Sequence, residues 1–585
     1  MTMRHRNQQS RSAPGARTFV AVVVLAVVTT SCGLFDDSHG YQKPLADDDR
    51  PWILVDLRHT EIQNPVDYRL HRAQYNYQGT YGFYRLFEHL ERHDFPWAPT
   101  DEPLSTPRLT PYDILFINLV HDRMPDFTDD EVEAIQEFVA DGGGLFVIGD
   151  HTNVYRHAER INPILEPMGL EMMYHTVTDQ PPVYSVSGLG WIMVFDFADH
   201  PINDGVEMIS FKTGGPVAAV DPDDDLAMTS EESFADFWNP DNDEGYYGNW
   251  KQGDDEELEP SGPLSVASAT EYGDGRAVLV GDQNIFGDAW INLGHNFDFA
   301  TNAFEWLAGR EDTDEPMRDQ PRRGHNIAFE SDVNYFQVAR NAPKGYYTTF
   351  VETNRNEAVT ARATPSLELD NTDTLMLVSS DIEFDVHELN DRAYTDDQLD
   401  EIQGFLSDGG RVVISFEPHD IPEPTVQLLE ALTGNFALEM GDKTWLPGDD
   451  EVPAPKAIDG FHPIDSTAFD VDGLRLGTLA ADEFPSDDDY LGDAASYQPG
   501  DFDAHLYDVR AQNAVPLVEA DTGDAIVTVA AKKRVGDGEL IIFPQDGFWR
   551  NQTMGSEELL EPTSFFRRDI VDFHHRFLDY LVATE

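Results

Sequence analysis

A segment that occurs twice constrains the fold of this chain more than any other feature. Residues 128–151 read TDDEVEAIQEFVADGGGLFVIGDH, and residues 395–419 read TDDQLDEIQGFLSDGGRVVISFEPH. In the first copy Thr128 and Glu131 have the spacing of a capping box, and the apolar residues after them recur on one helix face. Two glycines then end the helix, and a short apolar run predicts a buried strand. The chain is therefore organised around two copies of one helix–strand unit.

The segments around each copy extend this pattern. In the first half, apolar runs predict strands at residues 52–55, 114–119, 145–148 and 276–280, and in the second half at 327–329, 375–378 and 540–543. Amphipathic segments between them predict helices, and a Gly-Asp-Gly turn precedes the last strand of each half. Strands joined by helical crossovers form a mostly parallel sheet that is covered on both faces. We therefore predict an α/β fold with two tandem doubly wound domains, of the flavodoxin-like or Rossmann-like kind.

Composition shifts give the expected boundaries. We predict a signal peptide at 1–31, a tether at 32–50, a first domain at 51–310, a linker at 311–324 and a second domain at 325–585. The linker sequence has little to bury, so we expect the two halves to fold independently. The acidic, Gly- and Pro-containing segment 221–262 is expected to be an exposed loop.

The amino-terminal residues have the composition of a targeting segment. Four arginines precede the apolar stretch 19–28, which at ten residues is short for a bilayer span, and small residues lead to Cys32. This arrangement resembles a bacterial lipoprotein signal, which implies that Cys32 is lipidated; an ordinary secretory peptide is the alternative. Gly33 after the cysteine resembles the sorting pattern of outer-membrane lipoproteins. Because Cys32 is the only cysteine, the chain has no internal disulfide and no other thiol for catalysis.

The charge balance excludes one class of partner. Lys and Arg number 39 against 109 Asp and Glu, which gives a formal net charge of −70. Such a charge repels nucleic acid and anionic lipid surfaces, so no nucleic-acid partner is expected. Haloadaptation is the simplest account, since a carboxylate-coated surface stays soluble in molar salt. Calcium binding is the alternative, although the sequence contains no EF-hand loop.

Several motifs of the first half resemble those of one known superfamily. These motifs are the apolar strand beginning at Tyr112-Asp113-Ile114-Leu115, the Thr-x-x-Glu helix, the Gly-Gly break, the later Gly-x-Gly strand and the closing Asn302–Leu307 helix. In the order of these motifs the first half resembles the class I glutamine amidotransferase-like, flavodoxin-like superfamily. Within it, the chain is most similar to the non-catalytic branch of gliding-motility and ABC-transport auxiliary proteins and intraflagellar-transport subunits. The resemblance covers residues 50–310 well and residues 325–585 more loosely. It implies the same fold and no amidotransferase chemistry.

The nucleophile position supports the same expectation. In amidotransferases a cysteine stands on the turn after a central strand, where a helix start lowers its pKa. The comparable turns here hold Asp150-His151 and Glu417-Pro418-His419. We therefore expect no glutaminase or cysteine-peptidase activity, and we assign no catalytic residues.

Polar residues follow each predicted strand of the first half. In open parallel sheets, ligands bind beyond the carboxyl ends of the strands. The candidate ligand-binding residues at these ends are Asp56, Arg58, His59, His121, Asp122, Asp150, His151, Asp282 and Asn284. We expect His59, His121 and His151 to open into a common crevice, with Asp150-His151 at its centre. Carboxylates with imidazoles suit a polar ligand, a divalent metal or acid–base work, while the alternative is that these ends are simply acidic and the histidines cap helices.

The second half offers a smaller set of such residues. They are Glu330, Asp332, Glu417, His419 and Asp420. The two histidines of the earlier strands have no counterparts there, so this half is expected to be a structural partner.

Together these features predict a lipid-anchored binding or scaffold protein of the cell envelope, in the outer membrane of a halophilic bacterium. Its expected partners are the membrane, through lipidated Cys32, a polar small molecule or carbohydrate at the strand ends, and other envelope proteins. We expect no cofactor, with a divalent metal as the alternative. The rival function is a metal-dependent hydrolase that uses the Asp and His residues of the first half.

Overall fold

The structure is a computed structural model. It describes residues 49–60, 82–179, 190–239, 241, 247–253, 255, 257–288, 290–331, 333, 346–378, 393–416, 423–433, 436–440, 443–445, 456–459, 463–465, 469–472, 474, 476, 503–521, 523, 525–544, 548–550, 554 and 565–583. The predicted signal peptide, Cys32 and nearly all of the tether lie outside these residues. Within the described ranges, no helix combines the length and the apolar character needed to cross a bilayer.

The first half is built on a sheet that has eight strands among the described residues. In spatial order these are β2 (Trp97–Thr100), β1 (Ile53–Asp56), β3 (Ile114–Ile117), β4 (Gly144–Ile148), β14 (Gly275–Val280), β13 (Ser265–Tyr272), β11 (Asp225–Met228) and β8 (Asp196–Phe197). The first five run parallel, and the last three pair antiparallel. The parallel part has the flavodoxin-like order 2-1-3-4-5, which confirms the predicted fold class.

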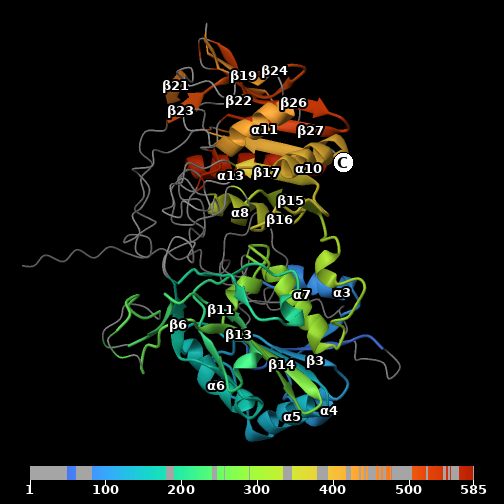
Figure 1. Ribbon diagram of the computed structural model, residues 1–585, viewed down its shortest axis with the longest axis vertical. Helices are drawn as coiled ribbons and strands as arrows, with labels where there is room; N and C mark the ends of the chain where they lie inside the picture. The colour runs from blue at the N-terminus through green and yellow to red at the C-terminus, as the bar shows by residue number, and fades with distance from the viewer. Residues whose placement is uncertain are drawn as a thin grey trace, which may run out of the picture. The chain divides into compact units, whose positions relative to one another are not determined.

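Alternating residues of the parallel strands supply the two faces of this sheet. On one face, Ile53, Phe116 and Phe146 pack in a core with α3 (Tyr84–Arg92) and α7 (Asn296–Leu307). On the other face, the intervening residues, such as Leu54 and Leu145, pack with α4 (Thr106–Leu109), α5 (Asp129–Ala140) and α6 (His157–Leu165). Figure 1 shows these helices around the sheet, with α4, α5 and α6 grouped together. The sheet is therefore doubly wound, as the near-continuous apolar strands predicted.

The second half repeats this strand order. Its sheet, again eight-stranded among the described residues, consists of β16 (Val359–Ala363), β15 (His325–Phe329), β17 (Thr374–Val378), β18 (Arg411–Ser415), β27 (Gly538–Phe543), β26 (Ile526–Val535), β25 (Val515–Asp521) and β22 (Pro463–Asp465). One face packs against α8 (Tyr347–Asn354) and α13 (Phe565–Ala583), and the other against α10 (Asp396–Ser407) and α11 (Glu423–Thr433). Because each strand has a counterpart at the same place in the order, the two sheets are structural repeats.

Short strands outside the two large sheets complete the described structure. In the first half β5 (Leu170–Met172) pairs with β10 (Val217–Ala219), β6 (His175–Thr178) with β12 (Phe234–Phe237), and β7 (Met193–Val194) with β9 (Ile209–Ser210). In the second half β19 (Phe436–Met440) pairs with β20 (Lys443–Trp445) and β24 (Asp508–Ala511), and β21 (Lys456–Asp459) with β23 (Asp503–Leu506).

The repeated segment begins with a capped helix in both copies. In α5 the Thr128 side chain accepts from the Glu131 backbone, and the Glu131 carboxylate accepts from the Thr128 backbone at 3.0 Å. Thr395 and Gln398 form the same reciprocal pair at the start of α10. Gly142 and Gly409, with φ of 109° and 113°, end the two helices, where a residue with a Cβ would be strained. The predicted start and stop signals are confirmed in both halves.

A hairpin turn packs against each of these helix ends. A Cβ on Gly275 would overlap the carbonyl oxygens of Val139 and Gly143, at the end of α5. Gly538 stands in the same relation to the end of α10. The Gly-Asp-Gly turn is therefore needed for contact as well as for its own conformation, because only glycine allows the two backbones to approach so closely.

Two expectations about loops are wrong. Segment 221–262, expected to be an exposed loop, contributes β11 to the large sheet and β12 to the pair with β6, and Phe234 is buried. Segment 311–324 was expected to have nothing to bury, but Met317 belongs to the core of the first half and donates its backbone N–H to Glu305 at 2.9 Å. Acidic composition concealed both elements, because their few apolar residues lie among many carboxylates.

The two halves also share an apolar cluster. Trp191, Trp290 and Leu293 of the first half pack in the same core as Phe350 and Ala363 of the second. Two backbone hydrogen bonds join them: Gly294 donates to Ala363 at 2.7 Å, and Ala363 donates to Asn292 at 3.1 Å. Each half alone would expose part of this cluster to water, which argues against the expected independence of the halves.

The close approach of hairpin and helix predicts the effect of a single methyl group. Gly275→Ala should lower the free energy of unfolding by about 1–3 kcal/mol, because the new Cβ forces two backbones apart. The matched control is Gly404→Ala, since Gly404 lies in α10 with open space around it. That variant should gain roughly 0.5–1 kcal/mol from helix propensity. Denaturant unfolding of both variants measures the difference, and equal effects would contradict the packing argument.

Candidate functional site

The sequence-predicted residues lie along one edge of the first sheet. Strands β1, β3, β4 and β14 are adjacent and parallel, so their carboxyl ends meet at that edge. The strand order reverses direction between β1 and β3, since β2 lies on the other side of β1. The topological switch point is therefore at the ends of β1 and β3, and not at Asp150-His151, where we expected the centre of the site.

His59, at the switch point, is held in a structural network. Its Nδ1 lies 2.9 Å from the Asp56 carboxylate and its Nε2 lies 3.5 Å from Glu131. The ring is fully buried and stacks on Phe127 at 3.8 Å between centroids. Arg58 lies 3.5 Å from the same Glu131 carboxylate. These contacts tie the end of β1 to the start of α5.

Glu131 is the residue of this group that the sequence reading missed. Burial alone would raise the pKa of its carboxyl, but hydrogen bonds from Thr128 and Leu104 outweigh burial and lower the pKa. The signal that could have found it is the capping box itself, because that motif places the Glu131 carboxylate at the helix start, beside the strand end. For His59 the structure therefore agrees with the alternative interpretation, in which the histidine packs against a helix cap.

The backbone of His121 is hydrogen-bonded to that of His59, but the His121 ring packs against a different aromatic residue. Its backbone N–H donates to the His59 carbonyl at 3.0 Å, while its ring stacks on Tyr155 at 3.9 Å. Its Nδ1 accepts from the Arg123 backbone at 3.1 Å and lies 3.0 Å from Asp122. The His151 ring packs against a third aromatic ring, Tyr247, at 4.4 Å. The three histidines therefore do not face the single common crevice that we expected.

The structure does bring Asp150 and Asp282 together, and we call them the carboxylate pair. Both side chains are buried, and burial raises the pKa of both carboxyls, that of Asp282 to about 7. The charge of Asp282 raises the pKa of Asp150 further, because two nearby carboxylates cannot both ionise cheaply. Backbone N–H groups stabilise them: His151 donates to Asp150 at 2.7 Å and Asn284 to Asp282 at 2.8 Å. At neutral pH the pair retains a proton.

The surroundings of the carboxylate pair hold its geometry. Segment 212–215 lies over it, with the Lys212 backbone donating to Asp282 and no room for a Cβ at Gly214 or Gly215. The Lys212 ammonium lies over the rings of Trp191 and Trp290, at 4.4 and 4.8 Å. This amine is thus held by cation–π contacts, while its charge opposes the rise in the pKa of Asp282.

His157 fixes the backbone on the other side. Its Nδ1 donates to the Val154 carbonyl at 2.7 Å and its Nε2 accepts from the Asp150 N–H at 3.1 Å. Burial lowers the pKa of His157 to about 4, so the ring is neutral near pH 7 and can act as donor and acceptor at once.

An aromatic strip lies beside the carboxylate pair, formed by His151, Tyr247 and Trp250. Tyr247 stacks on Trp250 with an interplanar angle of 23°, and both are half-buried. The buried Asp236 carboxylate holds this loop, since it accepts from the Trp250 backbone at 2.6 Å and the Asn249 backbone at 3.3 Å. The sequence reading missed both aromatics, although the Tyr-Gly-Asn-Trp stretch stands out within an acidic segment.

The remaining predicted residues take defined places. Asn284 donates from its side chain to the Lys212 carbonyl at 3.0 Å, and Asp122 is the most exposed member of the set. Glu330, in the second half, accepts from the Val333 backbone, while Asp332, Glu417, His419 and Asp420 lie outside the described residues. Across the part of the chain that the structure describes, no group of three or more His, Cys, Asp or Glu is placed to hold a metal ion.

Comparisons with known proteins give a family match for the first half. Residues 77–304 match a family described as "Domain of unknown function (DUF4350)", which spans the first sheet from α3 to most of α7. The N-terminal domain of mmIFT52 is similar, with 15% identity over 45% of this chain and 99% of that chain and a TM-score of 0.34. None of the curated proteins matches the chain.

Two bacterial structures are similar at the same level. A ThuA-like protein from Bacteroides uniformis has 14% identity, covering 48% of this chain and 100% of that chain, with a TM-score of 0.27. A ThuA-like protein from Parabacteroides merdae has 13% identity, covering 46% and 93%, with a TM-score of 0.27. The carboxylate pair and the aromatic strip are described from this chain itself.

The carboxylate pair predicts a pH-dependent stability. A carboxyl whose pKa is raised by folding binds its proton more tightly in the folded state, so the free energy of unfolding falls as pH rises from about 4 through about 7. Asp150→Asn removes one of the coupled carboxyls and keeps an oxygen for the His151 N–H. Its stability should fall less steeply over pH 5–8, by up to about 1.4 kcal/mol per pH unit.

The control for this experiment is Glu133→Gln, which removes an exposed carboxylate from α5. Its stability-against-pH curve should run parallel to that of the parent protein. Urea unfolding at several pH values gives both curves. A curve for Asp150→Asn that also runs parallel to the parent would show that the pair does not hold a proton.

Proposed function

We propose that this protein is a lipid-anchored binding or scaffold component of the cell envelope, and that its first half binds a polar ligand such as a carbohydrate. The proposed binding surface is the aromatic strip of His151, Tyr247 and Trp250, with the carboxylate pair behind it. The amidotransferase-like fold serves here as a scaffold for binding rather than for glutamine hydrolysis.

The single observation that supports a carbohydrate is the aromatic strip beside a proton-sharing carboxylate pair. Stacked aromatic rings offer flat apolar faces to the C–H groups of a sugar ring, and their polar tips stay hydrated. A pair of carboxyls that holds one proton is donor and acceptor together, which matches hydroxyl groups. The Asp236 contacts fix the loop that carries Tyr247 and Trp250, so little side-chain and loop ordering is needed when a ligand binds.

The aromatic strip gives the direct test of ligand binding. Trp250→Ala and Tyr247→Ala should each weaken binding of a neutral oligosaccharide about tenfold or more, since each ring removes roughly 1–2 kcal/mol of stacking and burial. Tyr112→Ala is the matched control, because Tyr112 precedes β3 at the opposite edge of the sheet. Calorimetric titration across a panel of oligosaccharides measures the affinities.

The outcomes separate the proposal from its rival. Binding that is lost in the strip variants and kept in the control supports a carbohydrate surface. Equal binding in all variants, or none in the parent protein, rules it out. A metal-dependent hydrolase would instead carry stoichiometric metal after purification, so elemental analysis of the same samples distinguishes the two functions.

The envelope location rests on Cys32, which lies outside the described residues. Cys32→Ala should release the protein from the membrane fraction, because the apolar stretch before it is too short to anchor the chain once lipidation is lost. Fractionation of cells that express the parent and the variant measures the change. A variant that still requires detergent for extraction would exclude the lipoprotein proposal.

A further inference from the structure

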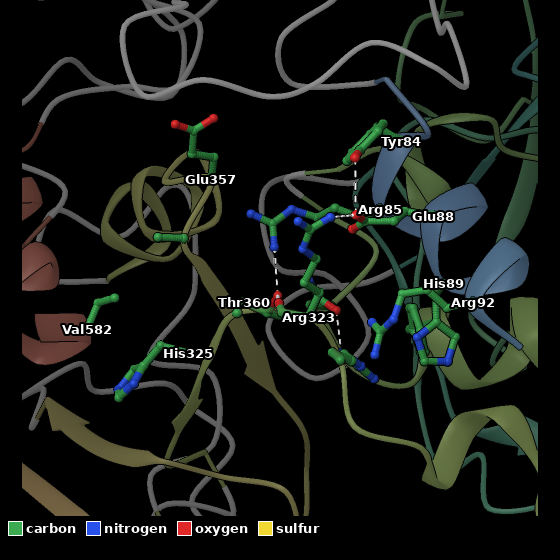
Figure 2. Close-up of a pocket in the computed structure, with 15 residues that line it drawn as sticks. Tyr84, Arg85, Glu88, His89, Arg92, Arg323, His325, Glu357, Thr360 and Val582 are labelled. Carbon is green, nitrogen blue, oxygen red and sulfur yellow. Dashed lines mark hydrogen bonds and ion pairs between the residues drawn. The ribbon is translucent and has the colours of Figure 1, made fainter. Parts of the chain in front are cut away.

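A cavity of about 660 Å³ lies where the two halves meet. Helix α3 of the first half lines one side, and residues of the second half, including Thr360 of β16, line the other. The volume falls within the range of small-molecule sites, about 300–1,000 Å³. Figure 2 shows Arg85 and Arg323 near the centre of this space, with Thr360 of the second half beside them.

The charge of the cavity wall is opposite to that of the chain. Four arginines line it, Arg85, Arg92, Arg322 and Arg323, against two carboxylates, Glu88 and Glu357. In a chain with 39 basic and 109 acidic residues, a wall of average composition would be acidic. The excess of arginine therefore marks this cavity as a cationic site within a strongly anionic protein.

Arg85, one of two half-buried arginines in this wall, is held by neutral groups. Arg85 donates to the Thr360 hydroxyl at 2.9 Å and to the carbonyls of Asn354 at 2.7 Å and Asn356 at 3.1 Å. Among the described residues no carboxylate comes within 4.0 Å of its guanidinium. The hydrogen-bond partners of its guanidinium are neutral and fix the group in place, while the carboxylates of Asp288 and Glu88 act on its charge from a longer distance.

Arg322 forms a second fixed positive group. Its guanidinium lies 3.8 Å from the centroid of Phe297, and the nearest carboxylate, Asp298, is 3.4 Å away. Burial lowers the pKa of Arg322 to about 10, so it stays protonated at neutral pH. His89, also in the wall, has its pKa lowered by burial to about 3 and is neutral.

The other two arginines are exposed and can reach a ligand. Arg92 donates to the Pro321 carbonyl at 3.1 Å, and Arg323 pairs with Glu88. In Figure 2 the side chains of Arg85 and Arg323 come together near the centre of the cavity, one reaching toward Thr360 and the other toward Glu88. Guanidinium groups in this arrangement suit the oxygens of phosphate and carboxylate groups.

We propose that this cavity binds a small multivalent oxyanion, bearing phosphate or carboxylate groups, between the two halves. Arg92 and Arg323 contact the anion, and Arg85 and Arg322 supply a fixed positive wall. Because Arg92 lies on α3 of the first half and Arg323 on the segment 311–324 that leads into the second half, the bound anion links these two parts of the chain and stabilises the folded state increasingly as its concentration rises. The site is separate from the strand ends and takes the opposite kind of ligand.

The test titrates the full chain with tripolyphosphate and with citrate at one fixed ionic strength. We expect saturable binding of at least one of them by calorimetry, with tripolyphosphate preferred for a phosphorylated ligand and citrate preferred for a polycarboxylate. The net charge of the protein repels anions elsewhere on its surface, so non-specific uptake is small. Absence of saturable binding of both probes would overturn the proposal.

Variants locate the site. Arg92→Gln and Arg323→Gln should each weaken binding about tenfold or more, because each removes charge-assisted hydrogen bonds to the anion. Arg534→Gln is the matched control, since Arg534 is an exposed arginine paired with Asp537 away from the cavity. Equal affinity in the cavity variants and the parent, or an equal loss in the control, would overturn the proposal.

A fourth variant moves the affinity in the opposite direction. Glu88→Gln removes the carboxylate that occupies Arg323, so binding should tighten about two- to fivefold. A merely structural role for the ion pair would lower the melting temperature without tightening anion binding. Melting temperatures of all variants without ligand confirm that they fold, and weaker binding by Glu88→Gln would contradict the arrangement.

Discussion

The geometry of each half depends on how closely a hairpin turn approaches the end of a helix. At Gly275 and Gly538 the backbones are too close for any side chain. This contact sets β14 beside β4 with Val280 level with Ile148, so the residues two positions further along, Asp150 and Asp282, emerge side by side. The carboxylate pair is therefore a consequence of packing elsewhere in the sheet. In the second half the same count gives Glu417 and Gln545, so its sequence lacks a second carboxylate pair.

Burial governs the chemistry of both candidate sites, with opposite results. Desolvation raises the pKa of Asp150 and Asp282, and the pair escapes much of the cost by keeping a proton. Arg85 and Arg322 cannot escape in this way, because a guanidinium remains protonated even with a lowered pKa. The carboxylate pair is thus a buried and nearly neutral polar group, whereas the cavity between the halves keeps its positive charge.

The sequence predicted the parallel strands and capped helices because their apolar periodicity is local and strong. It did not predict β11 or the packing of Met317, where few apolar residues lie among many carboxylates. The sequence also did not predict the directions in which the histidine rings point. Topology placed His59 and His121 at neighbouring strand ends, but side-chain partners far along the chain, such as Phe127 and Tyr155, turn the two rings apart. Strand ends can be predicted from local sequence, but the composition of a pocket cannot.

Salt distinguishes the surface charge from the charge in the cavity. At about 1 M salt the Debye length is near 3 Å, so repulsion among exposed carboxylates is largely screened. Charged groups that are partly buried in the protein are screened less by salt. Arg85 is held by a hydrogen bond to Thr360, and Arg322 is held by a cation–π contact with Phe297. Their field therefore persists under conditions in which the repulsion from the −70 net charge of the chain is largely screened for an approaching anion. In molar salt the repulsion that would keep anions away is weakened more than the attraction inside the cavity, so the acidic surface and the cationic cavity are compatible in one chain.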